Sequence, residues 1–169
     1  MVSIRAATVE DASAISHVHV ESWRATYKGI VPEEHLASLS EAEHVPLWRK
    51  WLALEVQAFV AAMNGEVVGF ACGGRIREPL QDYGAELYAI YLLPQAQGHG
   101  LGSALLKTLA DALLAQGFKS MVAWVLLDNS SSVFYRKTGA VPVSQKETQI
   151  GSAVLPVIAF GWPYLELIA

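Results

Sequence analysis

Glycines recur at close spacing in one short stretch of the 169-residue chain, and residues of this type and spacing are suited to binding an anion. The stretch is Gln97 to Gly102, with the sequence Gln-Gly-His-Gly-Leu-Gly. It follows an alternating apolar segment, 86–93, and opens a helical apolar pattern at 101–113. Where a strand turns into a helix, free backbone N–H groups and the positive end of the helix dipole point the same way. Glycine leaves these groups open, so we expect a phosphate or pyrophosphate to bind at this turn.

Two common phosphate-binding motifs do not fit this stretch. A dinucleotide-binding turn needs a third glycine three residues after the second, and Ser103 stands at that position. A P-loop needs a lysine and a serine or threonine after its last glycine, but Gly102 is followed by Ser103 and Ala104. The spacing that remains is Gln-x-x-Gly-x-Gly. A turn that only packs a helix against a strand is the alternative without a ligand.

The turn must be positioned by the strands and helices around it, which the apolar pattern predicts. Strands are expected at 3–7, 56–63, 66–77, 85–93, 121–127, 141–150 and 153–162. Helices are expected at 8–27, 32–39, 41–54, 100–116 and 130–137. The strand–helix–strand order around the turn predicts that 85–93 and 121–127 are parallel. The nearly unbroken apolar sequence of 121–127 indicates a strand covered on both faces.

The composition indicates one domain, residues 1–169, with a sizeable core, because 53% of the residues are hydrophobic and 17% are charged. No apolar run approaches the roughly 18 residues of a membrane span, and the N-terminus has no signal-peptide core. The lone Cys72 permits no internal disulfide and agrees with a reducing compartment. The formal net charge is −4, with no basic cluster along the sequence. We therefore expect a cytoplasmic protein that binds neither a membrane nor nucleic acid.

Aromatic residues occur at helical spacing in the segment 8–27. His19, Trp23 and Tyr27 follow one another at intervals of four. An aromatic helix of this kind can line an acceptor pocket, but packing into a core is the commoner use of this spacing. His17 and His19 are two residues apart and do not share a helix face, which argues against a metal pair. We expect no bound metal.

Two motifs resemble those of the GCN5-related N-acetyltransferase (GNAT) superfamily. The first is the segment 93–103, which contains the superfamily's pyrophosphate-binding signature, Gln-x-x-Gly-x-Gly. The second runs from Asn129 through Phe-Tyr-Arg-Lys-Thr-Gly-Ala at 134–140. A weaker match, 21–29, is similar to a pattern in bacterial members. The order of the elements also resembles the superfamily over nearly the whole chain.

This resemblance implies an α/β (α+β) fold. Its mixed, mostly antiparallel central sheet would have about seven strands with flanking helices, and the fourth and fifth strands would be parallel and splayed. The implied cosubstrate is acetyl-CoA, with its pyrophosphate on the glycine turn, its pantetheine arm between the splayed strands and its thioester carbonyl polarised by a backbone N–H. The implied cofactor-binding residues are Ile90, Tyr91, Leu92 (the N–H donor), Gln97, Gly98, His99, Gly100, Leu101, Gly102, Ser103, Asn129 and Tyr135.

The second motif departs from the superfamily's pattern at two places. Ala140 stands where a phenylalanine is usual. The interval from Asn129 to Phe134 is one residue shorter than usual. The polar contact with the pantetheine arm is therefore open among Asp128, Asn129 and Ser130.

The resemblance also implies two catalytic residues. Attack of an amine on a thioester needs a base, because the amine arrives largely protonated. Glu86 lies early in the central strand, where several members carry their catalytic glutamate; the alternative is an ordinary strand-end carboxylate facing solvent. Tyr135 would protonate the leaving thiolate, since a phenol with a pKa near about 10 keeps its proton at neutral pH. No cysteine nucleophile is evident, which favours direct transfer in a ternary complex.

The acceptor implied by the resemblance is a primary amine of a small molecule or a peptide. Its pocket would involve Trp23, Tyr27 and Glu86, with the loop 75–83 and the last hairpin. Members often pair, so a homodimer that uses this aromatic-rich hairpin is compatible with the sequence. A CoA-binding or acyl-CoA-binding sensor or interaction module without turnover is the alternative function, and it predicts cofactor binding without transfer.

Overall fold

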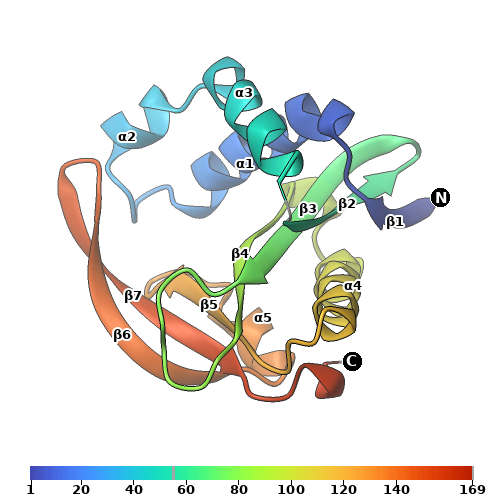
Figure 1. Ribbon diagram of the computed structural model, residues 1–169. Coiled ribbons are helices and arrows are strands. Elements are labelled where there is room, and N and C mark those ends of the chain that lie inside the picture. The colour runs from blue at the N-terminus through green and yellow to red at the C-terminus, as the bar shows by residue number, and fades with distance from the viewer. Residues whose placement is uncertain (55, 169) are drawn as a thin grey trace.

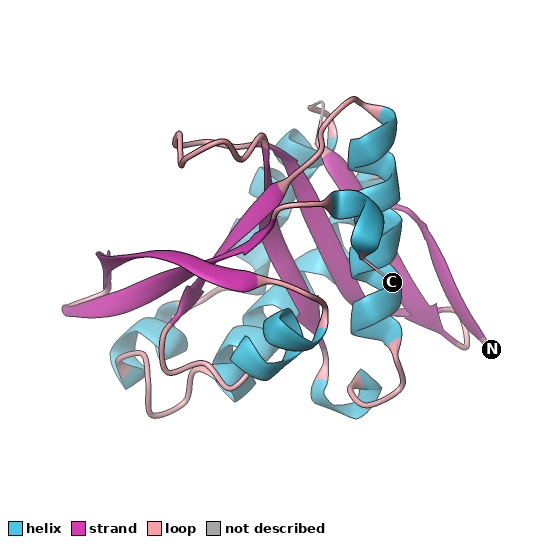
Figure 2. Ribbon diagram, turned by 90° about the horizontal axis from the view of Figure 1, so that it is seen from below, coloured by secondary structure: helices cyan, strands magenta, loops and turns pink. Residues whose placement is uncertain are grey.

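A seven-stranded sheet with helices on both faces forms the protein, as the computed structural model of residues 1–54 and 56–168 shows (Figures 1 and 2). The strand order is β1-β2-β3-β4-β5-β7-β6. The strands are β1 (Val2–Ala6), β2 (Gln57–Met63), β3 (Glu66–Arg75), β4 (Ala85–Leu92), β5 (Met121–Leu126), β6 (Val141–Ile150) and β7 (Ala153–Trp162). In this part of the chain β4 and β5 run parallel and the other pairs are antiparallel. The predicted fold class is therefore confirmed.

The helices divide between the two faces of the sheet (Figure 1). The helices α1 (Ala12–Thr26), α2 (Glu33–Ser38) and α3 (Glu41–Leu52) lie together on one side. On the other side, α4 (Leu101–Ala115) packs across β2, β3 and β4, and α5 (Ser132–Lys137) follows β5. The first predicted helix begins later than expected, because a short 3₁₀ turn precedes α1. Asp11 Oδ2 accepts the backbone N–H of Thr8 at 2.8 Å, as expected for its helix-start signal.

The core lies where α4 covers the sheet. The leucines of α4 recur at helical spacing and are buried: Leu101, Leu105, Leu106, Leu109 and Leu113. Each fully buried leucine contributes roughly 2 kcal/mol of transfer free energy. β5 is buried over most of its length, because α4 and its neighbours cover one face and the α1 side covers the other, as its apolar sequence predicted.

β4 and β5 separate soon after they begin. They pair only at Ala85 with Met121 and at Glu86 with Val122, whereas β3 accompanies β4 as far as Leu92. The Leu93 N–H donates to Val68 O of β3 at 2.8 Å. Because successive N–H groups of a strand point to opposite edges, the N–H of Leu92, and that of Ile90 before it, face the gap beside β5. The predicted splay therefore leaves a length of β4 backbone free of a neighbouring strand among the described residues.

The long β6–β7 hairpin curves toward the helices of the α1 side (Figure 1). At its tip, a Cβ added to Gly151 would lie 3.0 Å from His35 Cβ of α2. Below the tip, a small buried cluster joins the end of α1 to the hairpin: Tyr27, Val31, Leu36, Leu126 and Val157. The hairpin therefore closes one side of the opening between β4 and β5.

Candidate active site

The glycine turn presents free backbone donors at the start of α4. Gly98 and Gly100 have φ of +79° and +78°, a conformation that costs other residues roughly 1 kcal/mol or more. A Cβ at either position would meet nothing within 4 Å, so the turn is open. The first helical hydrogen bond runs from Ala104 N to Gly100 O at 3.1 Å, which leaves the N–H groups of Leu101 to Ser103 without helical partners. This geometry is suited to binding an anion.

The remaining side chains of the turn lie at its rim. Gln97, His99 and Ser103 are exposed. The Gln97 side-chain amide approaches Leu92 O on the free edge of β4 at 3.4 Å. The turn and the free edge of β4 therefore form one continuous surface.

Gly102 has a packing role that the sequence did not reveal. A Cβ at this position would lie 3.3 Å from a ring carbon of Phe134 and 3.6 Å from a methyl carbon of Leu92. The missing side chain makes room for α5 against α4. Gly102 therefore differs from Gly98 and Gly100, which open the turn to solvent.

Four of the predicted site residues meet beside the gap between β4 and β5. Asn129 Nδ2 donates to Tyr27 Oη at 3.3 Å, and Trp23 Nε1 donates to Tyr91 Oη at 3.0 Å. The Trp23 and Tyr27 rings lie 4.6 Å apart. Residues predicted for the acceptor (Trp23, Tyr27) and for the cofactor (Tyr91, Asn129) thus lie in one cluster.

Asn129 is distinguished from its neighbours by burial. It is 6% exposed, whereas Asp128 and Ser130 are both exposed. Its Oδ1 accepts the Ser131 N–H at 2.9 Å, which holds the side chain toward the cluster. Of the three alternatives for a polar contact in the gap, the geometry favours Asn129.

Tyr135 of α5 is held in an aromatic stack. Its ring lies parallel to Phe160 of β7 at 5.5 Å, with Trp162 edge-on at 5.7 Å. Burial, and then the neighbouring Tyr27 hydroxyl, raise the pKa of Tyr135. Burial likewise raises the pKa of Tyr27 and of Tyr91, so all three phenols keep their protons at neutral pH.

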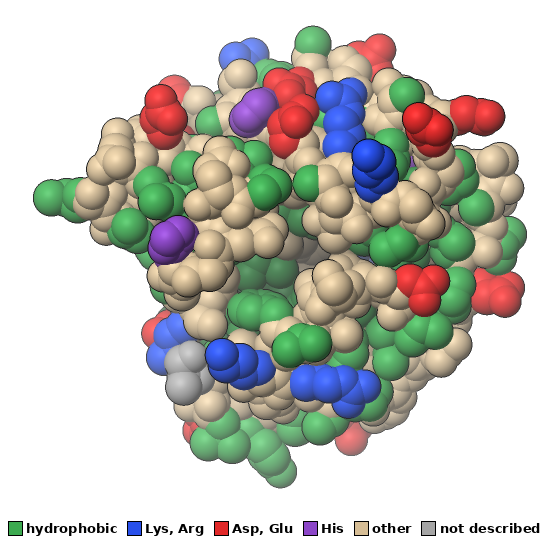
Figure 3. Space-filling model, turned by 180° about the vertical axis from the view of Figure 1, so that it is seen from behind, with side chains coloured by type: hydrophobic (Ala, Val, Ile, Leu, Met, Phe, Trp, Pro, Cys, Tyr) green, Lys and Arg blue, Asp and Glu red, His purple; other side chains and the backbone are tan. Residues whose placement is uncertain are grey.

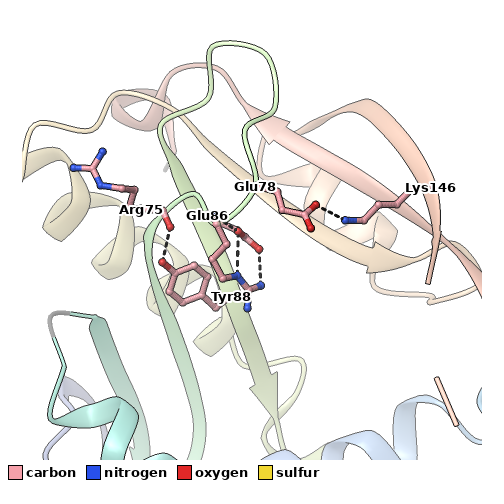
Figure 4. A network of polar contacts seen from close by, with 6 residues as sticks. Arg75, Glu78, Glu86, Tyr88 and Lys146 are labelled. Carbon is pink, nitrogen blue, oxygen red and sulfur yellow. Dashed lines mark hydrogen bonds and ion pairs between the residues drawn. The ribbon is translucent and has the colours of Figure 1, made fainter. Parts of the chain in front are cut away.

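Glu86 forms a buried ion pair with Arg77 (Figure 4). It is 3% exposed, so the alternative of a solvent-facing carboxylate is wrong. Arg77 Nη2 donates to Oε2 at 2.6 Å, while Arg77 Nε (3.2 Å) and the Arg77 backbone N–H (3.1 Å) donate to Oε1. Glu86 can therefore take a proton only after Arg77 yields one of these contacts, or through a water on a remaining lone pair.

The acidic residues near the loop after β3 are largely neutralised. Glu78 pairs with Lys146 of β6 at 2.9 Å, as Figure 4 also shows. Together with the pair of Glu86 and Arg77, this leaves Asp82 as the acidic residue of the loop for which the described residues show no ion pair, so less negative charge remains to attract a cationic amine. The loop and the hairpin meet where Gln81 Nε2 donates to Val143 O at 3.2 Å; that they line the acceptor pocket stays a prediction.

A pocket of about 320 Å³ lies between α1, α3 and β4. Its lining residues are His19, Trp23, His44, Leu47, Trp48, Trp51, Tyr88, Ala89 and Tyr91. Sequence reasoning expected Trp23 here but not the four residues from α3. Their spacing is that of any amphipathic helix. The only additional signal in the sequence was the unusual number of aromatic residues in this segment.

The face seen from behind the view of Figure 1 carries its own grouping of side chains. Figure 3 shows hydrophobic side chains within a hollow near its middle, with several Lys and Arg side chains gathered below. Positive charge is therefore concentrated locally although the net charge of the chain is −4.

Within residues 1–54 and 56–168, no group of three or more His, Cys, Asp or Glu is arranged to hold a metal. His17 Nδ1 lies 2.9 Å from Glu41 Oε1, away from His19. Burial raises the pKa of the Cys72 thiol to about 12, so this thiol is not a nucleophile at neutral pH. In the same residues, no helix has the length and apolar character needed to cross a membrane.

Comparison with known proteins agrees with these features. A model of the acetyltransferase (GNAT) family matches residues 18–140. The chain is 40% identical over 168 residues to an uncharacterised N-acetyltransferase, YuaI, of Bacillus subtilis (strain 168), covering 98% of this chain and 95% of that protein. It is 32% identical over 88 residues to the L-methionine sulfoximine/L-methionine sulfone acetyltransferase of Pseudomonas paraeruginosa (strain DSM 24068 / PA7), covering 52% of this chain and 51% of that protein.

A solved structure supports the same assignment. The PaiA N-acetyltransferase from Thermoplasma acidophilum, in complex with coenzyme A, superposes with a TM-score of 0.75 at 25% identity. The match covers 97% of this chain and 99% of that chain. The chain therefore belongs to the acetyltransferase (GNAT) family and is an acetyl-CoA-dependent N-acetyltransferase.

Proposed function

We propose that the protein transfers the acetyl group of acetyl-CoA directly to a primary amine of a small molecule or peptide, within a ternary complex. The observation that carries this proposal is the gap between β4 and β5, which joins the open glycine turn to free backbone donors and buried phenols. When bound there, acetyl-CoA supplies an activated acyl thioester. The relatives whose names state an acetyltransferase activity support the same chemistry.

The residues of the gap fit this cosubstrate. The N–H groups of Gly98 to Ser103 would bind its pyrophosphate, and the free edge of β4 at Ile90 and Leu92 would hydrogen-bond its pantetheine amides. The buried amide of Asn129 offers a further polar contact. The N–H of Leu92 is suited to holding the oxyanion that develops during attack, because a backbone donor fixed in a strand needs little reorganisation.

Proton transfer would involve Tyr135 and Glu86. The Tyr135 phenol keeps its proton at neutral pH and can donate it to the leaving thiolate. Glu86 would accept the proton of the amine through a water, because Arg77 occupies both of its carboxylate oxygens. A thiol nucleophile is not needed for this route, so no acyl-enzyme is formed on Cys72.

Small acceptors are favoured by one relative. The Pseudomonas paraeruginosa protein is named for amino-acid analogues, L-methionine sulfoximine and L-methionine sulfone. The pocket between α1, α3 and β4, at about 320 Å³, is at the small end of ligand sites. Both points favour a small molecule over a peptide.

The test is release of CoA from acetyl-CoA over a panel of polyamines, amino acids, aminoglycosides and short peptides. The wild type is compared with Tyr135→Phe and Glu86→Gln, with Glu147→Gln, an exposed carboxylate of β6, as the control. Both site variants should lose kcat while retaining affinity for acetyl-CoA by calorimetry, and the control should keep both. If acetyl-CoA does not bind to the wild type, the proposal fails.

A further inference from the structure

The pocket between α1, α3 and β4 is built from aromatic rings. His19 lies among four of them, with ring centroids 5.5 Å from His44, 5.6 Å from Tyr91, 5.7 Å from Trp48 and 6.0 Å from Trp23. Trp51 and Tyr88 extend the aromatic wall, with centroids 5.5 Å apart. Rings at such distances are in contact with one another and form a continuous aromatic wall, against which a flat apolar group can pack.

His19 carries a buried ring nitrogen without a partner. Its Nδ1 has no hydrogen-bond partner in the described part of the chain. A buried polar atom left unpaired costs free energy, and this one is enclosed by protein atoms, so it does not face the open part of the pocket. Burial, and then the nearby His44, lower the pKa of His19 to about 4, so the ring is neutral at pH 7.

The pocket offers little to attract a positive charge on the substituent, in addition to the charge of the reacting amine. No Asp or Glu is among the described residues that line it. The Arg77 guanidinium already covers the Tyr88 ring at 4.6 Å, so this aromatic face is occupied by a cation of the protein itself. The lining therefore favours an uncharged substituent.

The pocket adjoins the cluster of side chains beside the gap between β4 and β5. Trp23 and Tyr91 line the pocket and are joined by the hydrogen bond from Trp23 Nε1 to Tyr91 Oη. Trp23 also contacts Tyr27, which bonds to Asn129 at the gap. A substituent in the pocket would therefore leave an attached amine near the free edge of β4.

We propose that this pocket binds the uncharged, ring-bearing substituent of the acceptor amine, which packs against its aromatic wall. The inference rests on the proposed function, because it concerns the acceptor of the same transfer. It names the substrate class as small primary amines with a neutral aromatic or similarly apolar group, which should be preferred over polyamines and aminoglycosides.

The first experiment measures kcat/KM for four amines with the wild type at saturating acetyl-CoA. Phenethylamine and tyramine carry a ring, and tyramine adds a hydroxyl; putrescine and glycine carry no ring. The ring-bearing amines should exceed the other two by about tenfold or more. A preference for putrescine or glycine would overturn the inference and leave the proposed function standing.

Variants test the pocket residues separately. Trp51→Leu should raise KM for both ring-bearing amines about tenfold, with little change in kcat or in acetyl-CoA affinity. Leu54→Ala is the matched control, because Leu54 is exposed just beyond α3 and outside the pocket. His19→Phe keeps a flat ring in the wall, so it should leave the preference for ring-bearing amines in place.

Two further readouts separate the remaining outcomes. If no amine of the panel is acetylated, calorimetry of tyramine with the CoA-loaded protein decides: saturable binding that Trp51→Leu weakens supports the pocket, and no binding overturns it. Sedimentation of wild type and Trp51→Leu tests a second copy as the occupant. A dimer that dissociates in this variant, with acceptor selectivity unchanged, would also overturn the inference. If the wild type does not bind acetyl-CoA, the proposed function itself fails.

Discussion

At the scale of single residues, the site depends on which polar groups are already paired. Glu86 is paired with Arg77, and Asn129 with Tyr27 and the backbone, while His19 Nδ1 has no partner in the described chain. The paired groups are held in place for a ligand, whereas the unpaired one is enclosed by protein atoms and costs folding free energy. Changes to single atoms should therefore have distinct effects at these positions.

Tyr135→Phe should lower kcat about 100-fold while acetyl-CoA affinity stays unchanged, because only the proton donor is removed. Burial raises the pKa of Tyr135, and the protonated form is the active one. In the wild type, any loss of kcat from this residue should therefore begin only above about pH 10. A pH profile of kcat for both proteins checks this, and an unchanged kcat in Tyr135→Phe would refute the role.

His19→Phe should raise the free energy of unfolding by about 1 kcal/mol, because it removes a buried unpaired nitrogen. The folded-state pKa of His19 is lowered to about 4. Between that value and the unfolded value near about 6.5, the unfolded chain binds more protons, so wild-type stability falls as the pH drops through this range.

Thermal unfolding at pH 7 and pH 5 measures both effects of His19→Phe. Between pH 7 and pH 5, the Tm of the variant should fall by less than the Tm of the wild type. The control is His17→Phe, because His17 is an exposed histidine on the same helix. An equal loss of Tm in wild type and His19→Phe would mean that His19 does not titrate in this range.

At the scale of elements, the turn before α4 and the packing of α4 on α5 use glycine for different reasons. Gly98 has a positive φ and open space around it, whereas Gly102 is helical and close to Phe134. The same residue type thus serves a binding surface at one position and a helix–helix contact at the other. Two pairs of variants distinguish these uses.

Gly98→Asp should weaken acetyl-CoA binding about tenfold more than Gly98→Asn. Both side chains tolerate a positive φ and have the same shape, so the difference isolates one negative charge beside the pyrophosphate. The gap between the two dissociation constants should shrink as salt is added. Calorimetry at two ionic strengths measures this, and equal affinities would show that the pyrophosphate does not lie on this turn.

Gly102→Ala gains helix propensity but brings a Cβ to 3.3 Å from the Phe134 ring. The substitution should therefore stabilise the Phe134→Leu protein by about 1 kcal/mol more than it stabilises the wild type. Denaturant unfolding of the four proteins gives this coupling free energy. A coupling near zero would mean that Phe134 moves aside without strain.

At the scale of the whole molecule, the local patterns of the sequence predicted most of the elements, and the predictions failed where distant residues meet. The bounds of the last hairpin were predicted as 141–150 and 153–162, because alternation and a Gly-Ser turn are local signals. The ion pair of Glu86 with Arg77 was not predicted. It depends on how β3 and β4 are aligned across the bulge at Cys72 and Gly73.

The site was predictable to the extent that it follows motifs. The glycine turn was predicted from its residue types and spacing, and Asn129 and Tyr135 were predicted from the resemblance to a family. Their placement near one gap is a result of the fold. The contribution of α3 to the pocket was not predictable, because a helix face that lines a pocket and one that fills a core have the same apolar period. The single-domain, cytoplasmic and homodimer expectations remain predictions.

The separation of β4 from β5 has a mechanical consequence. Two residue pairs join the four strands β1–β4 to the three strands β5–β7, so the sheet is two blocks with a narrow seam. A cosubstrate in the opening would act as a substitute strand and complete the hydrogen bonding of the seam. Amide hydrogens of Ile90 and Leu92 should then exchange quickly with deuterated water in the free protein and slowly with CoA bound, which hydrogen-exchange mass spectrometry measures. The reacting ligand would thus also be a structural element that joins the two blocks of the sheet.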